Sequence, residues 1–188
     1  MSTFIVAVTS ADGFIANEDH VRSFEWNSKA DKDSFIHLTR DAGIVVMGSK
    51  TFETFPKRVN GQPNPLSGRL NIVYSRHPAK YIGKNVETTN KKPAELIRDI
   101  IIRGIHKDFG KSGGGDIAVI GGAEIYRMFI EANEIDRIYL TIEPVKFGHG
   151  IPFWQDGWKK KFQLDKKSEH KINGTKFQVY NRKNETSK

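Results

Sequence analysis

The chain has 188 residues, and 30 Lys and Arg against 22 Asp and Glu give it a formal net charge of +8. That length favours one globular domain, taken as residues 1–188, and a composition that is 37% hydrophobic and 11% aromatic excludes wholesale disorder. The absence of cysteine excludes disulfides, thiolate catalysis and Cys-built metal sites, and it fits a cytoplasmic protein.

The first half of the chain predicts alternating strands and helices. Apolar runs and helical spacing predict strands at 3–9, 14–16, 43–48 and 70–74, helices at 28–42 and 51–55, a turn at 10–13, and loops at 17–25 and 56–68. The run from Gly43 to Gly48 is rich in β-branched residues and lies between glycines, which is typical of a fully buried parallel strand.

The second half continues the alternation and ends in a hairpin. We expect helices at 94–103 and 123–132, strands at 117–120 and 137–142, a glycine-rich loop at 104–116, and hairpin strands at 162–170 and 175–182. The dipeptide Asn173-Gly174 favours a tight turn. Strands separated by helices predict an α/β fold of three layers, with a mainly parallel central sheet, helices on both faces and the antiparallel hairpin at one edge.

The positive charge is concentrated at the C-terminal end. Residues 1–157 carry 20 basic and 19 acidic side chains, a net of +1, whereas residues 158–188 carry 10 and 3, a net of +7. A protein that binds nucleic acid is expected to spread its charge along a helix or a face. We therefore expect solvated strand faces here, with an anion site or a nucleic-acid-binding hairpin as alternatives. Apolar stretches fall short of the ~20 residues of a membrane helix, so no membrane association is expected.

Two junctions place a glycine between a buried strand and a helix. They are Gly48-Ser49-Lys50-Thr51 and Gly121-Gly122-Ala123-Glu124. The free N–H groups and positive dipole at such a helix start suit a phosphate, and two junctions in one small domain suggest an extended ligand with a pyrophosphate. Neither a G-x-G-x-x-G fingerprint nor a phosphate-binding P-loop is present.

Asp31 is the candidate catalytic carboxylate, and its spacing allows two interpretations. Ser28-x-x-Asp31 matches a capping box, in which Asp31 reaches back to the helix start. Alternatively, Asp31 faces the sheet with Phe35, where a carboxylate beside aromatic rings has a raised pKa or binds a cationic heterocycle. The six histidines form no pair at metal-binding spacing, and no nucleophile elbow is present, so we expect neither a metal site nor covalent catalysis.

Several stretches, in the same order, resemble the dihydrofolate reductase family over nearly the whole chain. Trp26, followed by Asp31 and Phe35, resembles the substrate segment of that family, and Val45–Phe52 resembles its V-I-M-G-x-x-T-W box. The other matching stretches are Ile5–Val8, Leu66–Arg76, Ile120–Tyr126, Tyr139–Thr141 and Lys176–Tyr180.

The resemblance implies reduction of 7,8-dihydrofolate to 5,6,7,8-tetrahydrofolate with NADPH as cofactor. Asp31, with Thr141 and Trp26 in the catalytic set, would bind the pterin and promote protonation of its imine nitrogen, and Arg69 would hold the glutamate α-carboxylate. The implied substrate-binding residues are Val6, Ala7, Asp31, Phe35, Phe55, Leu66, Arg69, Ile120, Tyr126 and Thr141. The implied cofactor-binding residues are Ala7, Ile15, Ala16, Gly48, Ser49, Lys50, Thr51, Tyr74, Ser75, Arg76, Gly121, Gly122, Ala123, Glu124, Ile125 and Tyr126.

The resemblance further implies a cis peptide between Gly121 and Gly122, a small-molecule substrate, a monomer, and diaminopyrimidine antifolates as candidate inhibitors. Some segments depart from the family. Glu25 stands where proline is frequent, loop 104–115 is longer than usual, and Ser10–Ala16 and Gly148–Phe153 are closer to a related group. That group includes the pyrimidine reductases of riboflavin synthesis, which share the fold and NADPH but lack the carboxylate on the first helix. A pyrimidine reductase is therefore the alternative function.

Overall fold

The computed structural model describes residues 1–19, 22–57, 61, 63–81, 83–111, 115–154 and 157–183. Within these residues the strands are β1 (Thr3–Thr9), β2 (Phe14–Ala16), β3 (Gly43–Gly48), β4 (Leu70–Tyr74), β5 (Val86–Thr89), β6 (Asp116–Val119), β7 (Arg137–Ile142), β8 (Ile151–Pro152), β9 (Phe162–Leu164), β10 (His170–Ile172) and β11 (Thr175–Arg182). The helices are α1 (Lys29–Ala42), α2 (Ser49–Glu53), α3 (Pro93–Ile102), α4 (Ala123–Glu131) and α5 (Trp158–Lys161), with 3₁₀ turns η1 (Ser23–Glu25), η2 (Pro78–Lys80) and η3 (Ile105–Lys107).

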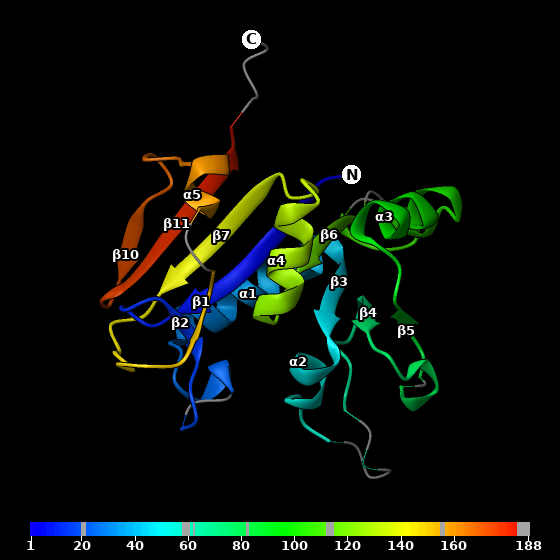
Figure 1. The fold of residues 1–188 in the computed structure, drawn as a ribbon, viewed down its shortest axis with the longest axis horizontal. Helices are drawn as coiled ribbons and strands as arrows, with labels where there is room; N and C mark the ends of the chain where they lie inside the picture. Colours follow the sequence, from blue (N-terminus) through cyan, green and yellow to red (C-terminus); the bar gives the residue numbers. More distant parts are fainter. Residues whose placement is uncertain are drawn as a thin grey trace.

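The central sheet has the strand order β10-β11-β7-β1-β6-β3-β4-β5, and β9 also pairs with β11 (Figure 1). The strands from β7 to β5 are parallel to their neighbours, whereas β11 runs antiparallel to β7 and pairs antiparallel with β9 and β10. A second small sheet pairs β2 with β8. The predicted α/β class, with a mainly parallel sheet and antiparallel strands at one edge, is confirmed.

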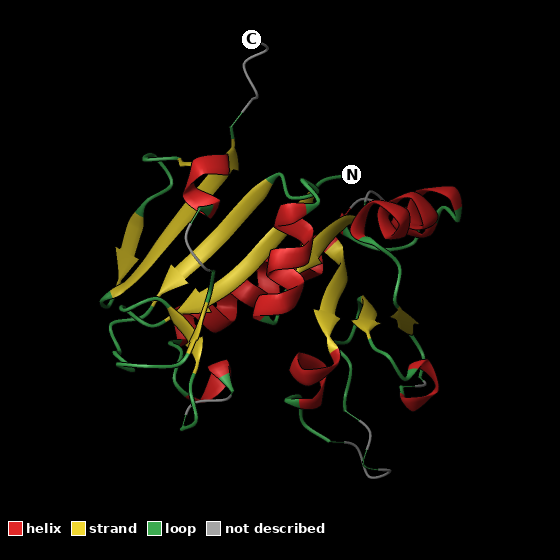
Figure 2. Ribbon diagram, in the orientation of Figure 1, coloured by secondary structure: helices red, strands yellow, loops and turns green. Residues whose placement is uncertain are grey.

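Both faces of the sheet are covered, because its central parallel strands β1, β3 and β6 are apolar on both sides. In β1, Phe4 and Val6 pack in one core cluster, while Ile5 and Ala7 pack in the other. The first cluster lies against α1 and α2, and the second contains the buried residues of α3 and α4. Figure 2 shows the sheet between α4 in front and α1 behind, which is the predicted arrangement of three layers.

Four parts of the sequence prediction need correction. Strand β5 and strand β8 were not expected, because β5 is short and partly exposed and β8 has only two residues. The segment 162–170 is not one hairpin strand but two short strands, β9 and β10, which pair with successive parts of β11. The basic run Lys159–Lys161 lies exposed on α5 rather than on a strand face. The expected tight turn is present, since Asn173 and Gly174 have φ of 49° and 90°.

The glycine-rich loop at 104–116 packs tightly against the turn that joins α1 to β3. Gly43 ends α1 with φ of 78°, and a Cβ on Gly43 would lie 2.0 Å from the backbone nitrogen of Gly110. Only glycine therefore allows the two backbones to approach this closely. Residues 112–114 of the loop lie outside the described residues, as do His20 and Val21 of the loop at 17–25.

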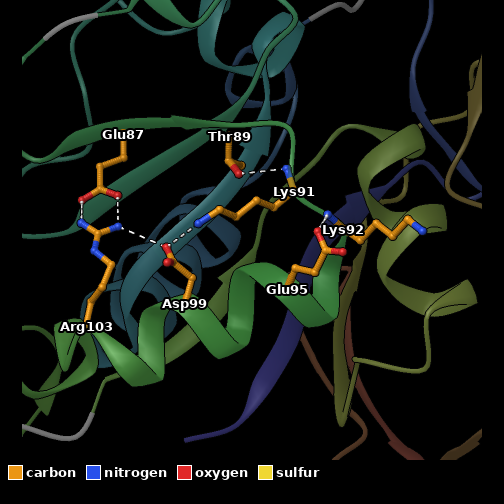
Figure 3. Close-up of polar contacts among 7 residues, drawn as sticks. All are labelled: Glu87, Thr89, Lys91, Lys92, Glu95, Asp99 and Arg103. Carbon is orange, nitrogen blue, oxygen red and sulfur yellow. Dashed lines mark hydrogen bonds and ion pairs between the residues drawn. The ribbon is translucent and has the colours of Figure 1, made fainter.

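Helix α3 is held against β5 by exposed ion pairs (Figure 3). The guanidinium of Arg103 donates to both carboxylate oxygens of Glu87 at 2.8 and 2.9 Å and contacts Asp99 at 3.3 Å. Asp99 also pairs with Lys91 at 2.9 Å. At the start of α3, a carboxylate oxygen of Glu95 accepts the backbone N–H of Lys92 at 3.3 Å. Glu87, Lys91, Asp99 and Arg103 therefore each have an opposite charge beside them, and Glu95 has a backbone donor.

None of the helices in the described part of the chain combines the length and the apolar character needed to cross a membrane.

Candidate active site

The carboxyl ends of the central parallel strands meet at one edge of the sheet, where α2 also lies (Figure 1). Ligands of open parallel sheets bind beyond this edge, because helix starts and loop side chains converge there. The first helix brings Asp31 to this edge, β7 brings Thr141, and β6 leads into Gly121 and Gly122. These groups come from distant parts of the sequence.

The capping box predicted at the start of α1 is only half formed. The hydroxyl of Ser28 accepts the backbone N–H of Asp31 at 3.1 Å, as a capping serine should. The return bond comes from another residue, because the backbone N–H of Ser28 donates to Oε1 of Glu143 at 2.8 Å. The Asp31 carboxylate is therefore not used as a helix cap.

Instead, the Asp31 carboxylate is buried and turned toward β7. The residue is 5% exposed, and its carboxylate accepts hydrogen bonds from the Thr141 hydroxyl and from Nδ2 of Asn27. Burial raises the pKa of Asp31. The bonds from Thr141 and Asn27 oppose that rise, and the nearby charge of Glu143 adds to it. The arrangement can hold a proton on a carboxyl group at higher pH than a solvated aspartate can.

Tyr126 connects α4 to β1 close to this carboxylate. Its hydroxyl donates to the backbone carbonyl of Val6 at 3.1 Å, and a Cβ built on Gly121 would lie 3.4 Å from the same hydroxyl. Burial, with the charge of Asp31 as a second cause, raises the pKa of Tyr126. The hydroxyl therefore stays protonated and remains a donor.

Two polar atoms in the segment just before α1 are buried without a hydrogen-bond partner among the described residues. They are the indole nitrogen of Trp26 and Oδ1 of Asn27. The Trp26 ring packs edge-on against Phe147, with ring centroids 5.0 Å apart. A buried polar atom without a partner costs roughly 1–3 kcal/mol, so both atoms are candidates to bond a ligand or a bound water.

Arg69 is a buried cation without a carboxylate partner. It is 3% exposed, one guanidinium nitrogen contacts the carbonyl of Ile36 at 3.5 Å, and Nε has no partner. Burial, and then the like charge of Arg40, lowers the pKa of Arg69 to about 10. Among the described residues no Asp or Glu pairs with it. An anion from outside the protein would supply the missing charge.

Most of the predicted substrate residues lie on the α1 side of the sheet. Val6, Phe55 and Ile120 are buried in that cluster, and Phe35 and Leu66 pack against it. The side chain of Asn71 holds the chain at Leu66 through bonds of 2.9 and 3.0 Å to the Leu66 backbone. Ala7 belongs to the opposite cluster, so its side chain is not brought to the others.

The predicted pyrophosphate residues form two adjacent helix starts. Gly48 precedes α2 and Gly122 precedes α4, and neither helix start has a side chain that caps it. The N–H of Gly48 donates to the carbonyl of Gly121 at 2.8 Å, and Gly121–Gly122 is the expected cis peptide. A Cβ on Gly121 would lie 3.3 Å from the Thr51 hydroxyl. Uncapped N–H groups with room for close approach fit the pyrophosphate of a dinucleotide.

The other predicted cofactor residues lie in the first turns of α2 and α4, in β2 and at the end of β4. Ser49 and Lys50 lie in the first turn of α2, and Ala123, Glu124 and Ile125 lie in that of α4. Ile15 and Ala16 lie in β2, which pairs with β8. At the end of β4, Ser75 accepts the N–H of His77 at 3.0 Å and Arg76 is exposed. The Tyr74 ring points inward against Phe129, and burial raises the pKa of Tyr74.

Sequence reasoning missed Asn27 and Glu143. Asn27 adjoins Trp26 and lies four residues before Asp31, so helical spacing could have indicated it. Glu143 lies two residues after Thr141, in a position that no local pattern connects to Ser28. Only the fold brings the two together.

Two further features lie outside this site. Among the described residues, no group of three or more His, Asp or Glu side chains is arranged to hold a metal ion. A cavity of about 300 Å³ lies at the amino ends of β4 and β5, lined by Leu70, Asn85, Val86, Glu87, Ile105, Asp108 and Phe109. None of the predicted site residues lines it.

The site thus consists of a buried carboxylate and two glycine-led helix starts at the carboxyl edge of a mainly parallel α/β sheet. Residues 1–183 match the family model described as dihydrofolate reductase. The chain therefore belongs to the dihydrofolate reductase family, an oxidoreductase family whose members generally use NADPH.

Two relatives cover most of the chain at low identity. A dihydrofolate reductase from Pneumocystis carinii is 27% identical over 188 residues, covering 88% of this chain and 84% of its own. The uncharacterized protein YyaP from Bacillus subtilis (strain 168) is 27% identical over 153 residues, covering 80% of this chain and 78% of its own.

Two solved structures share the fold. A putative riboflavin biosynthesis protein from Shewanella sp. PV-4 has a TM-score of 0.69 at 18% identity, covering 97% of this chain and 99% of that one. A Thermotoga maritima diaminohydroxyphosphoribosylaminopyrimidine deaminase/5-amino-6-(5-phosphoribosylamino)uracil reductase has a TM-score of 0.70 at 14% identity, covering 97% of this chain and 56% of that one.

Proposed function

We propose that this protein reduces 7,8-dihydrofolate to 5,6,7,8-tetrahydrofolate with NADPH. The observation that carries the proposal is the Asp31 carboxylate. It is buried, it is bonded to Thr141 and Asn27, and it takes no part in the helix cap that its spacing allows. A carboxyl group held this way suits a pterin, whose amide and amino groups donate to one carboxylate as a bidentate pair.

Reduction of the imine bond requires a hydride on carbon and a proton on nitrogen. NADPH supplies the hydride when it is bound. Asp31 supports the proton delivery, because its raised pKa keeps part of the carboxyl population protonated at higher pH than usual. Thr141 fixes the orientation of the carboxyl, and the indole N–H of Trp26, buried without a partner among the described residues, is a donor for a bound water or for the substrate.

Arg69 would bind the glutamate end of the substrate. Its guanidinium is buried and lacks a counterion among the described residues, so a carboxylate gains a charge-assisted bond there. Phe35, Phe55 and Leu66 supply the apolar wall between Asp31 and Arg69. The distance along α1 from Asp31 to Ile36, which Arg69 contacts, is about 7.5 Å at 1.5 Å per residue.

The two glycine-led helix starts would hold the pyrophosphate of NADPH. Thr51 adds a hydroxyl donor beside Gly121 and Gly122, and Lys50 adds a positive charge. Ser75 and Arg76 lie together at the end of β4, where an exposed arginine suits a 2′-phosphate. That arrangement favours NADPH over NADH.

A pyrimidine reductase is the second candidate function. Ser10–Ala16 and Gly148–Phe153, the two segments that are closer to the group of pyrimidine reductases, lie together, since β2 pairs with β8 and Asp12 accepts the N–H groups of Phe147 and Gly148. A pyrimidine reductase would not depend on Asp31 for turnover, whereas a dihydrofolate reductase would, and this difference distinguishes the two candidates.

The test measures the absorbance of the nicotinamide band when the protein is mixed with NADPH and 7,8-dihydrofolate, with NADH as the control. We expect turnover that prefers NADPH and that a diaminopyrimidine antifolate inhibits. NADPH binding without turnover of dihydrofolate would reject the first candidate and favour the second.

A further inference from the structure

Glu143 is a buried carboxylate that the proposed reaction does not use directly. It is 3% exposed and follows β7, and its Oε1 accepts the Ser28 N–H at 2.8 Å. Its Oε2 accepts the hydroxyl of Thr175, the first residue of β11, at 2.7 Å. One carboxylate therefore joins the start of α1, the end of β7 and the closing hairpin. Among the described residues no Lys or Arg forms an ion pair with it.

The start of α3 provides a comparison, because an acidic side chain at the same helix position there does accept the backbone N–H of the capping residue. Glu95 is the third residue of α3, as Asp31 is the third residue of α1. The Glu95 carboxylate reaches back to the backbone N–H of Lys92 at 3.3 Å. Asp31 does not reach back to Ser28, because Glu143 already occupies that N–H.

We propose that Glu143 is a positioning residue for Asp31: by accepting the first N–H of α1 in its place, it leaves the Asp31 carboxyl turned toward the pterin site. The inference rests on the proposed function only for its turnover measurements. It assigns a role to a residue outside the predicted site, and it gives the C-terminal hairpin a part in the active site through Thr175.

Glu143 also acts on Asp31 by its charge. The groups around Asp31 are Lys32 on the same helix, Asn27 before it, Thr141 on β7, Tyr126 on α4 and Glu143 after β7. Lys32 and the two hydrogen bonds lower the pKa of Asp31, whereas burial and Glu143 raise it. Tyr126 is neutral while its own pKa is raised. Glu143 is therefore the negative group that helps Asp31 keep its proton.

Two substitutions separate position from charge. In Glu143→Gln the amide oxygen still accepts the Ser28 N–H and the amide nitrogen donates to Thr175, but the charge is gone. We expect kcat to equal that of the wild type at low pH. Near neutral pH it falls roughly 3- to 10-fold, because less of the Asp31 carboxyl stays protonated once the negative charge of Glu143 is gone.

Glu143→Ala removes the acceptor as well. The Ser28 N–H is then free for Asp31, which turns back to the helix start as Glu95 does in α3. We expect turnover to fall roughly 10- to 100-fold at every pH, since a misplaced catalytic group loses about that factor, and lower pH does not restore it. The matched control is Glu169→Gln beside the same hairpin, where exposed Glu169 pairs with partly exposed Lys176; neither its kcat nor its pH profile changes.

The carboxyl ¹³C signal of Asp31 provides a readout that needs no substrate. We expect Glu143→Gln to lower the pKa that this signal reports relative to the wild type. An unchanged Asp31 titration together with an unchanged pH profile would overturn the charge role, and full turnover of Glu143→Ala would overturn the positioning role. If the wild type does not reduce dihydrofolate, the proposed function fails, and the ¹³C titration of Glu143→Ala still decides the positioning role: an Asp31 carboxyl that turns back to the Ser28 N–H accepts a backbone donor and its pKa falls, whereas an unchanged titration would overturn that role.

Discussion

Charged side chains are held in two different ways in this molecule. On the surface between α3 and β5, Arg103, Glu87, Asp99 and Lys91 are partly exposed, and each lies within 3.3 Å of an opposite charge (Figure 3). Asp31 and Glu143, at the carboxyl edge of the sheet, and Arg69, at the amino end of β4, are at most 5% exposed and form no ion pair with any described residue.

The exposed charges contribute to stability, whereas the buried charges are suited to hold a proton or to bind an anion. Exposed pairs cost little to form and contribute little, typically about 0–1 kcal/mol. A buried charge without a partner costs more and shifts its own pKa, which is useful where a proton must be held or an anion bound. Substitutions in the two regions should therefore differ in kind, and the following predictions are ordered from the largest expected effect to the smallest.

Asp31→Asn should cause the largest loss. We expect the fold and NADPH binding to persist while turnover at neutral pH falls roughly 10²- to 10⁴-fold, the usual contribution of a proton-transferring group. Because the folded pKa of Asp31 is raised, the wild type loses stability as pH rises through that pKa, and the variant does not. Thermal unfolding at pH 5 and 8 checks the second point.

The matched control is Asp33→Asn, two residues further along α1, where the carboxylate is exposed and pairs with Lys29 at 2.5 Å. Its kcat should stay unchanged. Equal turnover of Asp31→Asn and the wild type would reject the role given to Asp31.

Arg69→Gln should weaken substrate binding rather than the chemical step. Losing a charge-assisted bond of about 1.5–3 kcal/mol raises KM for dihydrofolate roughly 10- to 100-fold, with a small change in kcat. Arg103→Gln, in the exposed network, should leave KM unchanged. A wild-type KM for Arg69→Gln would place the glutamate end of the substrate elsewhere.

Asp12 gives a pH prediction outside the buried site. Hydrogen bonds from Ser10, Gly148 and Phe147 lower the pKa of Asp12 to about 2, below its usual 3.8. The stabilisation is therefore present above pH 3.8 and is lost as pH falls toward about 2. We expect Asp12→Asn to reduce the hydrogen-exchange protection of the Gly148 amide roughly 3- to 10-fold at neutral pH. Unchanged protection would mean that another contact holds this loop.

Glu95→Ala should have the smallest effect. The bond from the Lys92 N–H is lost, so the melting temperature should fall by about 1–3 °C, and turnover should match the wild type. A large loss of turnover would contradict the separation between the two regions.

The sequence predicted the elements whose pattern is local. Gly43–Gly48 was correctly expected as a buried parallel strand, because an apolar β-branched run between glycines has few other uses. Strand β5, Val86–Thr89, was missed since its polar residues and partial exposure resemble a loop. Helix α5 was missed because its four residues contain a single buried apolar side chain, Trp158.

The site could be predicted only as far as local spacing and family resemblance reach. The spacing Ser28-x-x-Asp31 is compatible with two interpretations, an Asp31 carboxylate that caps the helix and one that is free to bind a ligand. The choice depends on Glu143, which reaches Ser28 only through the pairing of β7 with β1. The burial of Arg69 without a counterion is likewise a property of the packed chain.

The bond between Glu143 and Thr175 also bears on how the protein is made. Ribosomes deliver α1 early, yet Glu143, which accepts the N–H at the start of α1, is itself bonded to the first residue of β11. A nascent chain shorter than 175 residues lacks that anchor, and closing such a distant contact is slow. The support that orients the Asp31 carboxyl is therefore complete only after residue 175 has been synthesised, and a product that terminates before it carries Asp31 without that support.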